Sequence, residues 1–150
     1  MRFKFLAVLA LAALVSACAG TTGGGAGSGS ATPGTQEDLV VNVGDRVFFD
    51  FDKYNLDSNA RRTLEKQAAW LKTNANLSVT IEGHADERGT REYNLALGER
   101  RANAAKDYLV ALGISPGRVK TISYGKERPV ALGSNEAAWA QNRRGVTTVN

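Results

Sequence analysis

The stretch at positions 77–112 decides the fold, and it reads LSVTIEGHADERGTREYNLALGERRANAAKDYLVAL. Residues 77–82 alternate apolar and polar side chains, which predicts a β-strand with one buried face. Residues 83–89 are a polar loop bounded by glycines, and residues 91–112 predict a long helix. Gly113 follows in the position that a helix C-terminus favours. The stretch is therefore a strand–loop–helix unit.

The sequence on both sides of this unit predicts one α/β domain, an α+β sandwich, over residues 38–150. Strands that alternate with helices favour parallel pairing through right-handed crossovers, but the last strand need not follow that pattern. We therefore expect the order β-α-β-α-β-(α)-β, a mixed sheet, and helices packed on one face. The elements expected outside the unit are a strand at 46–52, a helix that begins after a cap at Asp57 or Ser58 and runs to about Asn74, a strand at 119–124, an irregular stretch at 125–134, a short helix at 135–143 and a strand at 145–149.

The long helix carries one charge on the stripe that should face the core. Residues that recur every three or four positions share one face of a helix. On this helix they are Tyr93, Leu97, Arg101, Ala105, Tyr108 and Leu112. A guanidinium keeps its proton in proteins, so burying Arg101 is costly unless an anion pairs with it. Gly98 lies mid-helix, where glycine costs about 1 kcal/mol relative to alanine, and this indicates that something packs close to the backbone there.

Two carboxylates follow the first two predicted strands. If those strands are parallel, Asp52 and Asp86 lie at the same edge of the sheet, where open α/β sheets bind ligands. Arg101 faces that edge, and Asn94 flanks it. A forked cation with two carboxylates suits a zwitterion such as an α-amino acid group, with the guanidinium left accessible to the ligand. The alternative is a structural ion pair between Asp86 and Arg101 that fixes the loop to the helix.

The N-terminal part predicts a removable leader and a tether. Arg2 and Lys4 precede an apolar run from Phe5 to Val15, which is too short to span a bilayer permanently. Residues 1–17 therefore read as a signal peptide that ends before Cys18, the only cysteine. Seven of the sixteen glycines lie in residues 19–36, so residues 18–37 are expected to be Cys18 followed by a flexible Gly/Ser-rich linker.

The composition argues against several classes of function. Lys plus Arg is 19 and Asp plus Glu is 15, with no basic block, so we expect no nucleic-acid partner. One cysteine and one histidine exclude a cysteine-rich or histidine-rich metal site and leave little for a catalytic triad. An acid–base enzyme using His84, Asp86 and Glu87, with Ser123 as nucleophile, lacks a nucleophile elbow or phosphate loop. We therefore expect no enzyme, no metal and no cofactor, and interpret His84 as a surface or loop-packing residue.

Several motifs together resemble the peptidoglycan-associated lipoproteins, whose C-terminal domain belongs to the OmpA-like family. The sequence from Leu14 to Cys18, LVSAC, resembles the bacterial lipobox. The motifs GHADERGT at 83–90, EYN at 92–94 and LGERRANA at 97–104 carry most of the resemblance. FDFDKY at 49–54, SYGKE at 123–127 and NRR at 142–144 extend it over residues 38–150.

The resemblance implies a function and a site. In OmpA-like domains the residues that correspond to Asp86 and Arg101 bind the diaminopimelate side chain of peptidoglycan, and further contacts map onto Asp52, Asn94 and Leu97. The implied protein is an outer-membrane lipoprotein, anchored by acyl chains on Cys18, with its domain facing the periplasm. It would tether the outer membrane to the wall within the Tol–Pal system, which serves envelope integrity and outer-membrane invagination at division. TolB, which binds a surface overlapping the peptidoglycan site, is the implied partner, with TolA as a further one.

Two alternatives remain open at this stage. A lipoprotein that contacts Tol partners and no cell wall would not specifically need the Asp86 and Arg101 pair, although Trp70, Trp139 and the tyrosines could form such an interface. A flagellar-stator-type module is disfavoured because no transmembrane helix is predicted before the domain.

Overall fold

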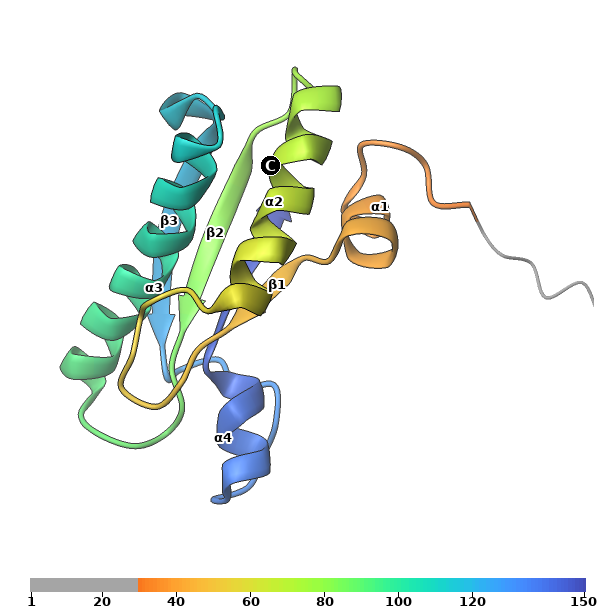
Figure 1. Ribbon diagram of the computed structural model, residues 1–150. Coiled ribbons are helices and arrows are strands. Elements are labelled where there is room, and N and C mark those ends of the chain that lie inside the picture. Colours follow the sequence, from red (N-terminus) through yellow and green to blue (C-terminus); the bar gives the residue numbers. More distant parts are fainter. Residues whose placement is uncertain (1–29) are drawn as a thin grey trace, which may run out of the picture.

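Four strands form one mixed sheet. The computed structural model describes residues 30–150, so the predicted signal peptide, Cys18 and the linker up to residue 29 lie outside the described residues. The strands are β1 (Arg46–Phe48), β2 (Val79–His84), β3 (Val119–Gly125) and β4 (Arg144–Val149), in the spatial order β1-β4-β2-β3 (Figure 1). β4 is antiparallel to β1 and to β2, whereas β2 and β3 are parallel. The predicted mixed sheet is confirmed, and β1 and β2 point the same way without being neighbours.

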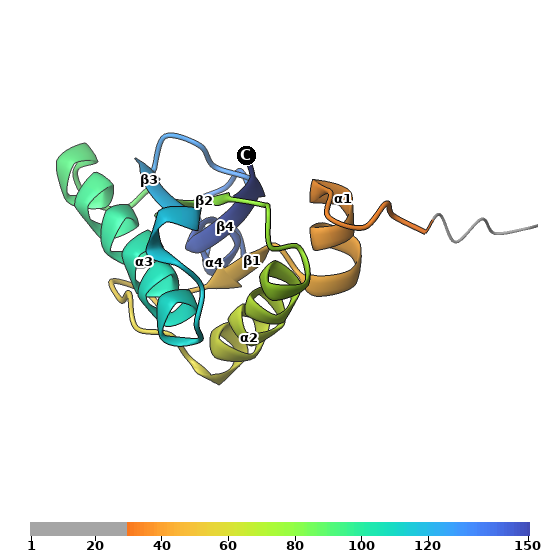
Figure 2. The same cartoon turned by 90° about the horizontal axis from the view of Figure 1, so that it is seen from above.

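The two long helices cover one face of this sheet. α2 (Ser58–Thr73) and α3 (Arg91–Ala111) lie on the same side of the strands (Figure 2). Each begins at a side-chain cap: Asp57 accepts a hydrogen bond from the N–H of Ala60 at 2.7 Å, and Thr90 accepts one from the N–H of Tyr93. The short α4 (Glu136–Asn142) lies instead at the end of the sheet where β1 and β2 stop (Figure 1). One turn of 3₁₀ helix, Pro116–Arg118, leads into β3.

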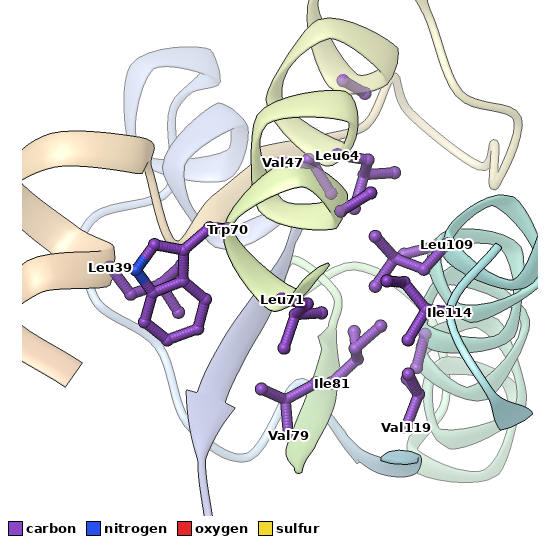
Figure 3. Packing of buried hydrophobic residues seen from close by; sticks show 14 of the residues in the cluster. Leu39, Val47, Leu64, Trp70, Leu71, Val79, Ile81, Leu109, Ile114 and Val119 are labelled. Carbon is purple, nitrogen blue, oxygen red and sulfur yellow. The ribbon is translucent and has the colours of Figure 1, made fainter. Parts of the chain in front are cut away.

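The hydrophobic core lies between these helices and the sheet. Leu64 and Leu71 of α2 meet Leu109 of α3 above the strand residues Val79 and Ile81 (Figure 3). All five are at most about 1% exposed, so this layer is closed to water. Burial of such side chains stabilises a domain by roughly 1.5–3 kcal/mol each, which makes this layer the main source of the fold's stability.

The helix α3 approaches β2 through a pair of glycines. A Cβ atom on Gly83 would lie 1.7 Å from the carbonyl oxygen of Gly98, and a Cβ on Gly98 would lie 2.3 Å from Ser123 Oγ. Neither position can hold a side chain without moving the helix. The close approach that the mid-helix glycine predicts is confirmed, and it places the first turns of α3 directly against the end of β2.

The ordered segment before β1 begins earlier than residue 38, which corrects the predicted boundary of the linker. α1 (Gln36–Asp38) continues into a short π-helix, Leu39–Val43. The Trp70 Nε1–H donates to Asp38 Oδ2 at 2.7 Å. The Gln36 side chain donates to the carbonyl of Thr147 and accepts from the N–H of Val149 at 2.8 Å. This N-terminal segment therefore covers Trp70 and part of the edge of β4 that the short β1 leaves free.

Two strand boundaries also differ from the prediction. The first strand ends at Phe48 rather than at residue 52, because the N–H of Lys53 bonds to the carbonyl of Asp50 in a turn. The second strand runs over 79–84 rather than 77–82, because Leu77 closes a turn onto Asn74. Within residues 30–150, none of the helices has the length and apolarity needed to cross a membrane.

Candidate functional site

A cavity of about 190 Å³ opens at the end of the sheet where β1 and β2 stop. The loop after β1, the loop after β2 and the first turns of α3 form its walls, and these segments meet at the lower end of the molecule in Figure 1. The lining residues are Phe51, Asp52, Asp86, Arg88, Gly89, Tyr93, Asn94, Leu97 and Arg101. The five residues that the sequence assigns to ligand contact, from Asp52 to Arg101, are all among them.

Arg101 is the most deeply buried side chain of the site, with 0% exposure. Its guanidinium donates to three backbone carbonyls: Nε to Lys53 at 2.8 Å, one terminal nitrogen to His84 at 2.8 Å and the other to Asp50 at 3.0 Å. Burial lowers the pKa of Arg101 to about 10, against the opposing effect of the Asp86 charge, so the group stays cationic at neutral pH. Three of the five N–H groups of the guanidinium are therefore bonded to backbone carbonyls.

Asp86 does not pair with Arg101, which corrects the structural alternative considered above. Arg88 donates to Asp86 through its backbone N–H, through Nε and through a terminal nitrogen at 2.7 Å. Arg143 adds a weaker contact of 3.4 Å to the same carboxylate. Burial alone would raise the pKa of Asp86, but the hydrogen bonds and charge of Arg88, with the help of Arg143, hold it below its usual value. Asp86 is therefore an ionised, buried carboxylate.

Arg88 lies between two aromatic rings. Its Cζ atom is 3.9 Å from the centre of the Phe51 ring and 4.0 Å from the Trp139 ring. The Trp139 Nε1–H in turn donates to Glu87 Oε1 at 2.9 Å. Cation–π contacts of this kind contribute about 0.5–1 kcal/mol each at exposed sites. α4 therefore holds the loop after β2 through its tryptophan, and this contact also positions Arg88.

Asp52 supplies an exposed carboxylate at the rim. Its φ of 55° is the only positive value among non-glycine residues within 30–150, and aspartate tolerates that conformation better than most residues. The Tyr93 hydroxyl donates to its carboxylate, and this bond raises the pKa of the tyrosine. An unusual backbone conformation held by its surroundings is typical of functional sites.

Asn94 and Leu97 complete the floor of the cavity. The Asn94 side-chain amide donates to the carbonyls of Arg88 at 2.8 Å and Thr90 at 3.0 Å, which fixes the shape of the loop. Within residues 30–150 its Oδ1 accepts no side-chain or loop hydrogen bond, so it can accept one from a ligand. Leu97 is 5% exposed and offers an apolar surface. The cavity thus combines a buried guanidinium, an exposed carboxylate and an apolar floor, which suits a small zwitterion on an aliphatic chain.

A family model for the OmpA family matches residues 48–143. The chain belongs to the OmpA family. Among curated proteins, a peptidoglycan-associated lipoprotein from Rhizobium meliloti (strain 1021) is 58% identical over 83% of this chain and 71% of its own length. One from Pseudomonas putida is 42% identical over 96% of this chain and 95% of its own length.

A solved structure supports the same relationship. The crystal structure of the peptidoglycan-associated lipoprotein from Burkholderia pseudomallei is 44% identical and superposes with a TM-score of 0.69 over 71% of this chain and 90% of that one. This OmpA-family chain therefore belongs with the peptidoglycan-associated lipoproteins, and it is a non-enzymatic protein of the bacterial cell envelope.

Sequence reasoning missed five residues at this OmpA-family site: four that line the cavity, Phe51, Arg88, Gly89 and Tyr93, and Arg143, which contacts Asp86. Phe51 lies within the strand expected at 46–52, but β1 ends before it, and the residue is 56% exposed and lies against Arg88. Tyr93 was assigned to the core stripe and is exposed at the rim. Arg143 donates to the carbonyl of Phe49 at 2.8 Å and reaches Asp86 from the end of α4. The NRR motif was the available signal for Arg143, but it carried no indication of its partner.

The residues of the rejected enzyme hypothesis have packing roles. Ser123 donates to the carbonyl of Leu95 at 2.6 Å and so joins β3 to α3. His84 is 1% exposed, and neither ring nitrogen has a hydrogen-bond partner within residues 30–150. Burial, followed by the charges of Arg144, Arg128 and Arg46, lowers the pKa of His84 to about 4. No group of three or more His, Cys, Asp or Glu side chains in the described residues could hold a metal ion.

Proposed function

We propose that this protein binds the diaminopimelate side chain of peptidoglycan non-covalently and tethers the outer membrane to the cell wall. The observation that carries the proposal is the buried Arg101 cation, which lines one cavity together with the carboxylates of Asp52 and Asp86. The free end of diaminopimelate is an amino acid group on an aliphatic chain. Its carboxylate would pair with the Arg101 guanidinium, and its methylenes would lie on Leu97.

The ammonium of the same end group needs acceptors. Asp86, Asp52 and Asn94 line the same cavity and carry carboxylate and amide oxygens. Because two of these groups are anionic, they favour an ammonium over a neutral amine or hydroxyl. The carboxylate of the ligand is expected to lie deeper, near Arg101, and the ammonium nearer the rim.

The family and the N-terminal sequence support a proposal about the wider role. We infer that Cys18 is acylated, that the acyl chains insert into the outer membrane, and that the domain faces the periplasm within the Tol–Pal system. TolB is the expected partner, with TolA as a further one. The exposed rings of Phe51 and Tyr93 at the cavity support a protein partner that overlaps the wall site.

The test compares two stem peptides with the full chain in detergent solution. One peptide carries meso-diaminopimelate at its third position and the other carries lysine, which lacks the terminal carboxylate. We expect the lysine peptide to bind about 10- to 150-fold more weakly by calorimetry, because a charge-assisted hydrogen-bond pair is lost. Equal affinities for the two peptides would show that Arg101 does not bind the terminal carboxylate of diaminopimelate.

A matched pair of variants tests the rim. Asp52 lines the cavity, whereas Asp50 is an exposed carboxylate two residues earlier that does not line it. Asp52→Asn should weaken binding of the diaminopimelate peptide about 3- to 10-fold, and asparagine tolerates the positive φ. Asp50→Asn should leave binding unchanged. The same loss in both variants would indicate a general charge effect rather than a contact.

A further inference from the structure

We propose that Arg88 occupies the ammonium position of the empty site and must leave Asp86 when a ligand binds. The inference rests on the function proposed above and names a residue that sets the affinity of that site. It concerns the cavity wall formed by the loop after β2, where Arg88, Asp86 and two aromatic rings lie in contact.

The carboxylate of Asp86 has no position free for a ligand. A carboxylate offers about four lone-pair positions. Oδ1 accepts from the backbone N–H and the Nε of Arg88, both at 3.1 Å. Oδ2 accepts from the terminal nitrogen of Arg88 at 2.7 Å and from Arg143 at 3.4 Å. A ligand ammonium can therefore hydrogen-bond to Asp86 only after one of these donors has moved.

Arg88 is the donor that can move. Its side chain is 30% exposed, whereas that of Arg143 is 7% exposed. Arg143 is also tied to the carbonyl of Phe49 at 2.8 Å and to Glu136 at 2.6 Å. Arg88 has no further carboxylate within 4 Å in the described residues, and the rings of Phe51 and Trp139 can keep contact with a guanidinium that shifts between them.

The arrangement explains how an empty site can be stable. Asp86 is 4% exposed, and a buried carboxylate without a partner is strongly destabilising. In the empty site the Arg88 guanidinium pairs with Asp86, and on binding the ligand ammonium takes its place. The exchange replaces one ion pair by another, so net affinity falls by the free energy of the contact that is broken.

The test uses the full chain with Arg88→Gln, which removes the cation but keeps a long side chain. The control is Arg91→Gln, because Arg91 is an exposed cation nearby that pairs with Glu127 outside the cavity. The probes are the diaminopimelate peptide and the same peptide with 2-aminopimelate, which keeps the terminal carboxylate and lacks the ammonium. We expect Arg88→Gln to bind the first peptide about 5-fold more tightly than wild type and the second peptide with unchanged affinity. Arg91→Gln should match wild type for both.

The outcomes separate this inference from the proposed function. If wild type binds the diaminopimelate peptide but Arg88→Gln binds it more weakly, Arg88 is a ligand contact and the exchange is wrong. A gain that persists with the 2-aminopimelate peptide also overturns it. If wild type binds neither peptide, the proposed function itself fails, and the exchange fails with it.

A spectroscopic readout tests displacement directly. In the free protein the Arg88 Nε–H donates to Asp86, so its proton should exchange slowly and resonate at a distinct position in an NMR spectrum of ¹⁵N-labelled arginine side chains. Saturation with the diaminopimelate peptide should shift and broaden that signal, while the Arg143 Nε–H, bonded to a carbonyl, stays in place. An unmoved Arg88 signal in the saturated complex would show that Asp86 keeps its partner.

Discussion

The buried guanidinium of Arg101 hydrogen-bonds to backbone carbonyl groups rather than to a carboxylate. The carbonyls come from Asp50, Lys53 and His84, so one side chain joins the loop after β1, the end of β2 and α3. The sequence predicts a guanidinium that is accessible to a ligand. The side chain of Arg101 is instead 0% exposed, and its three hydrogen bonds hold the walls of the cavity together.

Arg101→Lys should therefore lower the free energy of unfolding as well as ligand affinity. A lysine ammonium cannot reach three carbonyls in the plane of a guanidinium, so at least one buried acceptor is left unpaired. We expect a loss of about 2–4 kcal/mol, measured by urea denaturation at pH 7. The control is Arg100→Lys, because Arg100 is exposed and should tolerate the change. An unaltered urea midpoint for Arg101→Lys would contradict this role.

His84 makes stability depend on pH. Its pKa is about 4 in the folded protein, against an ordinary value of 6.5, so the fold favours the neutral imidazole. The contribution is complete above pH 6.5 and is lost as the pH falls toward 4, because only the unfolded chain then binds the proton. The expected loss is about 3 kcal/mol.

Urea denaturation of wild type and His84→Gln between pH 7 and pH 4 measures this dependence. The variant should have a flatter profile over the range from 6.5 to 4, since it has no imidazole to protonate. Parallel profiles for the two proteins would mean that other groups cause the acid sensitivity.

At the scale of elements, the contact between α3 and β2 depends on two facing glycines. Gly98→Ala would normally stabilise a helix by about 1 kcal/mol. Here the added methyl group would lie 2.3 Å from Ser123 Oγ and 2.8 Å from the carbonyl oxygen of Gly83. We expect the substitution to destabilise the domain by about 1–3 kcal/mol in thermal or urea denaturation.

A double variant identifies the cause of that loss. Ser123→Ala combined with Gly98→Ala removes the flexible hydroxyl but leaves the backbone of Gly83 in the way. The double variant should remain less stable than Ser123→Ala alone. A gain in stability from Gly98→Ala in either background would show that the helix can shift at no cost.

The elements that the sequence predicts well are those with local signals. α2 and α3 have apolar stripes and side-chain caps, so their bounds match the expected ones to within one residue. The end of β1 was missed because the apolar alternation continues to Phe51, whereas the turn from Asp50 to Lys53 takes the chain out of the sheet. The π-helix was missed because residues 39–43 are ordered by their packing on Trp70, which a local pattern does not encode.

The distinction between local signals and tertiary packing also explains which parts of the candidate site could be predicted. The directions of two strands and the stripe of one helix were enough to predict that Asp52, Asp86 and Arg101 lie at the same edge of the sheet. The weaker contact from Arg143 to Asp86 could not be predicted, because Arg143 lies 57 residues away and follows α4. Arg88 was within the quoted loop motif, but its position between two rings depends on Trp139, which belongs to a distant helix.

At the scale of the whole molecule, the proposed anchor predicts where the protein is found in the cell. Cys18 lies outside the described residues, and its acylation is inferred from the sequence that precedes it. Cys18→Ser should remove the protein from the outer-membrane fraction and leave it either soluble or with its signal peptide uncleaved. Gly20→Ser, a neighbouring control, should stay in the outer-membrane fraction. The fractionation is done after enzymatic digestion of the wall, so that binding to peptidoglycan does not retain the protein. A Ser variant that still sediments with the outer membrane would exclude Cys18 as the anchor.

The short β1 strand has a mechanical consequence. The N-terminal segment feeds directly into β1, and β1 feeds directly into the loop whose carbonyls hold Arg101. Tension between the membrane and the wall would therefore enter near Gln36 and Asp38 and leave through the cavity. The bonds of those two residues to β4 and Trp70 would bear the load first, before the three-residue strand. The N-terminal segment would then detach from the domain first, and the cavity would keep its contact with the wall.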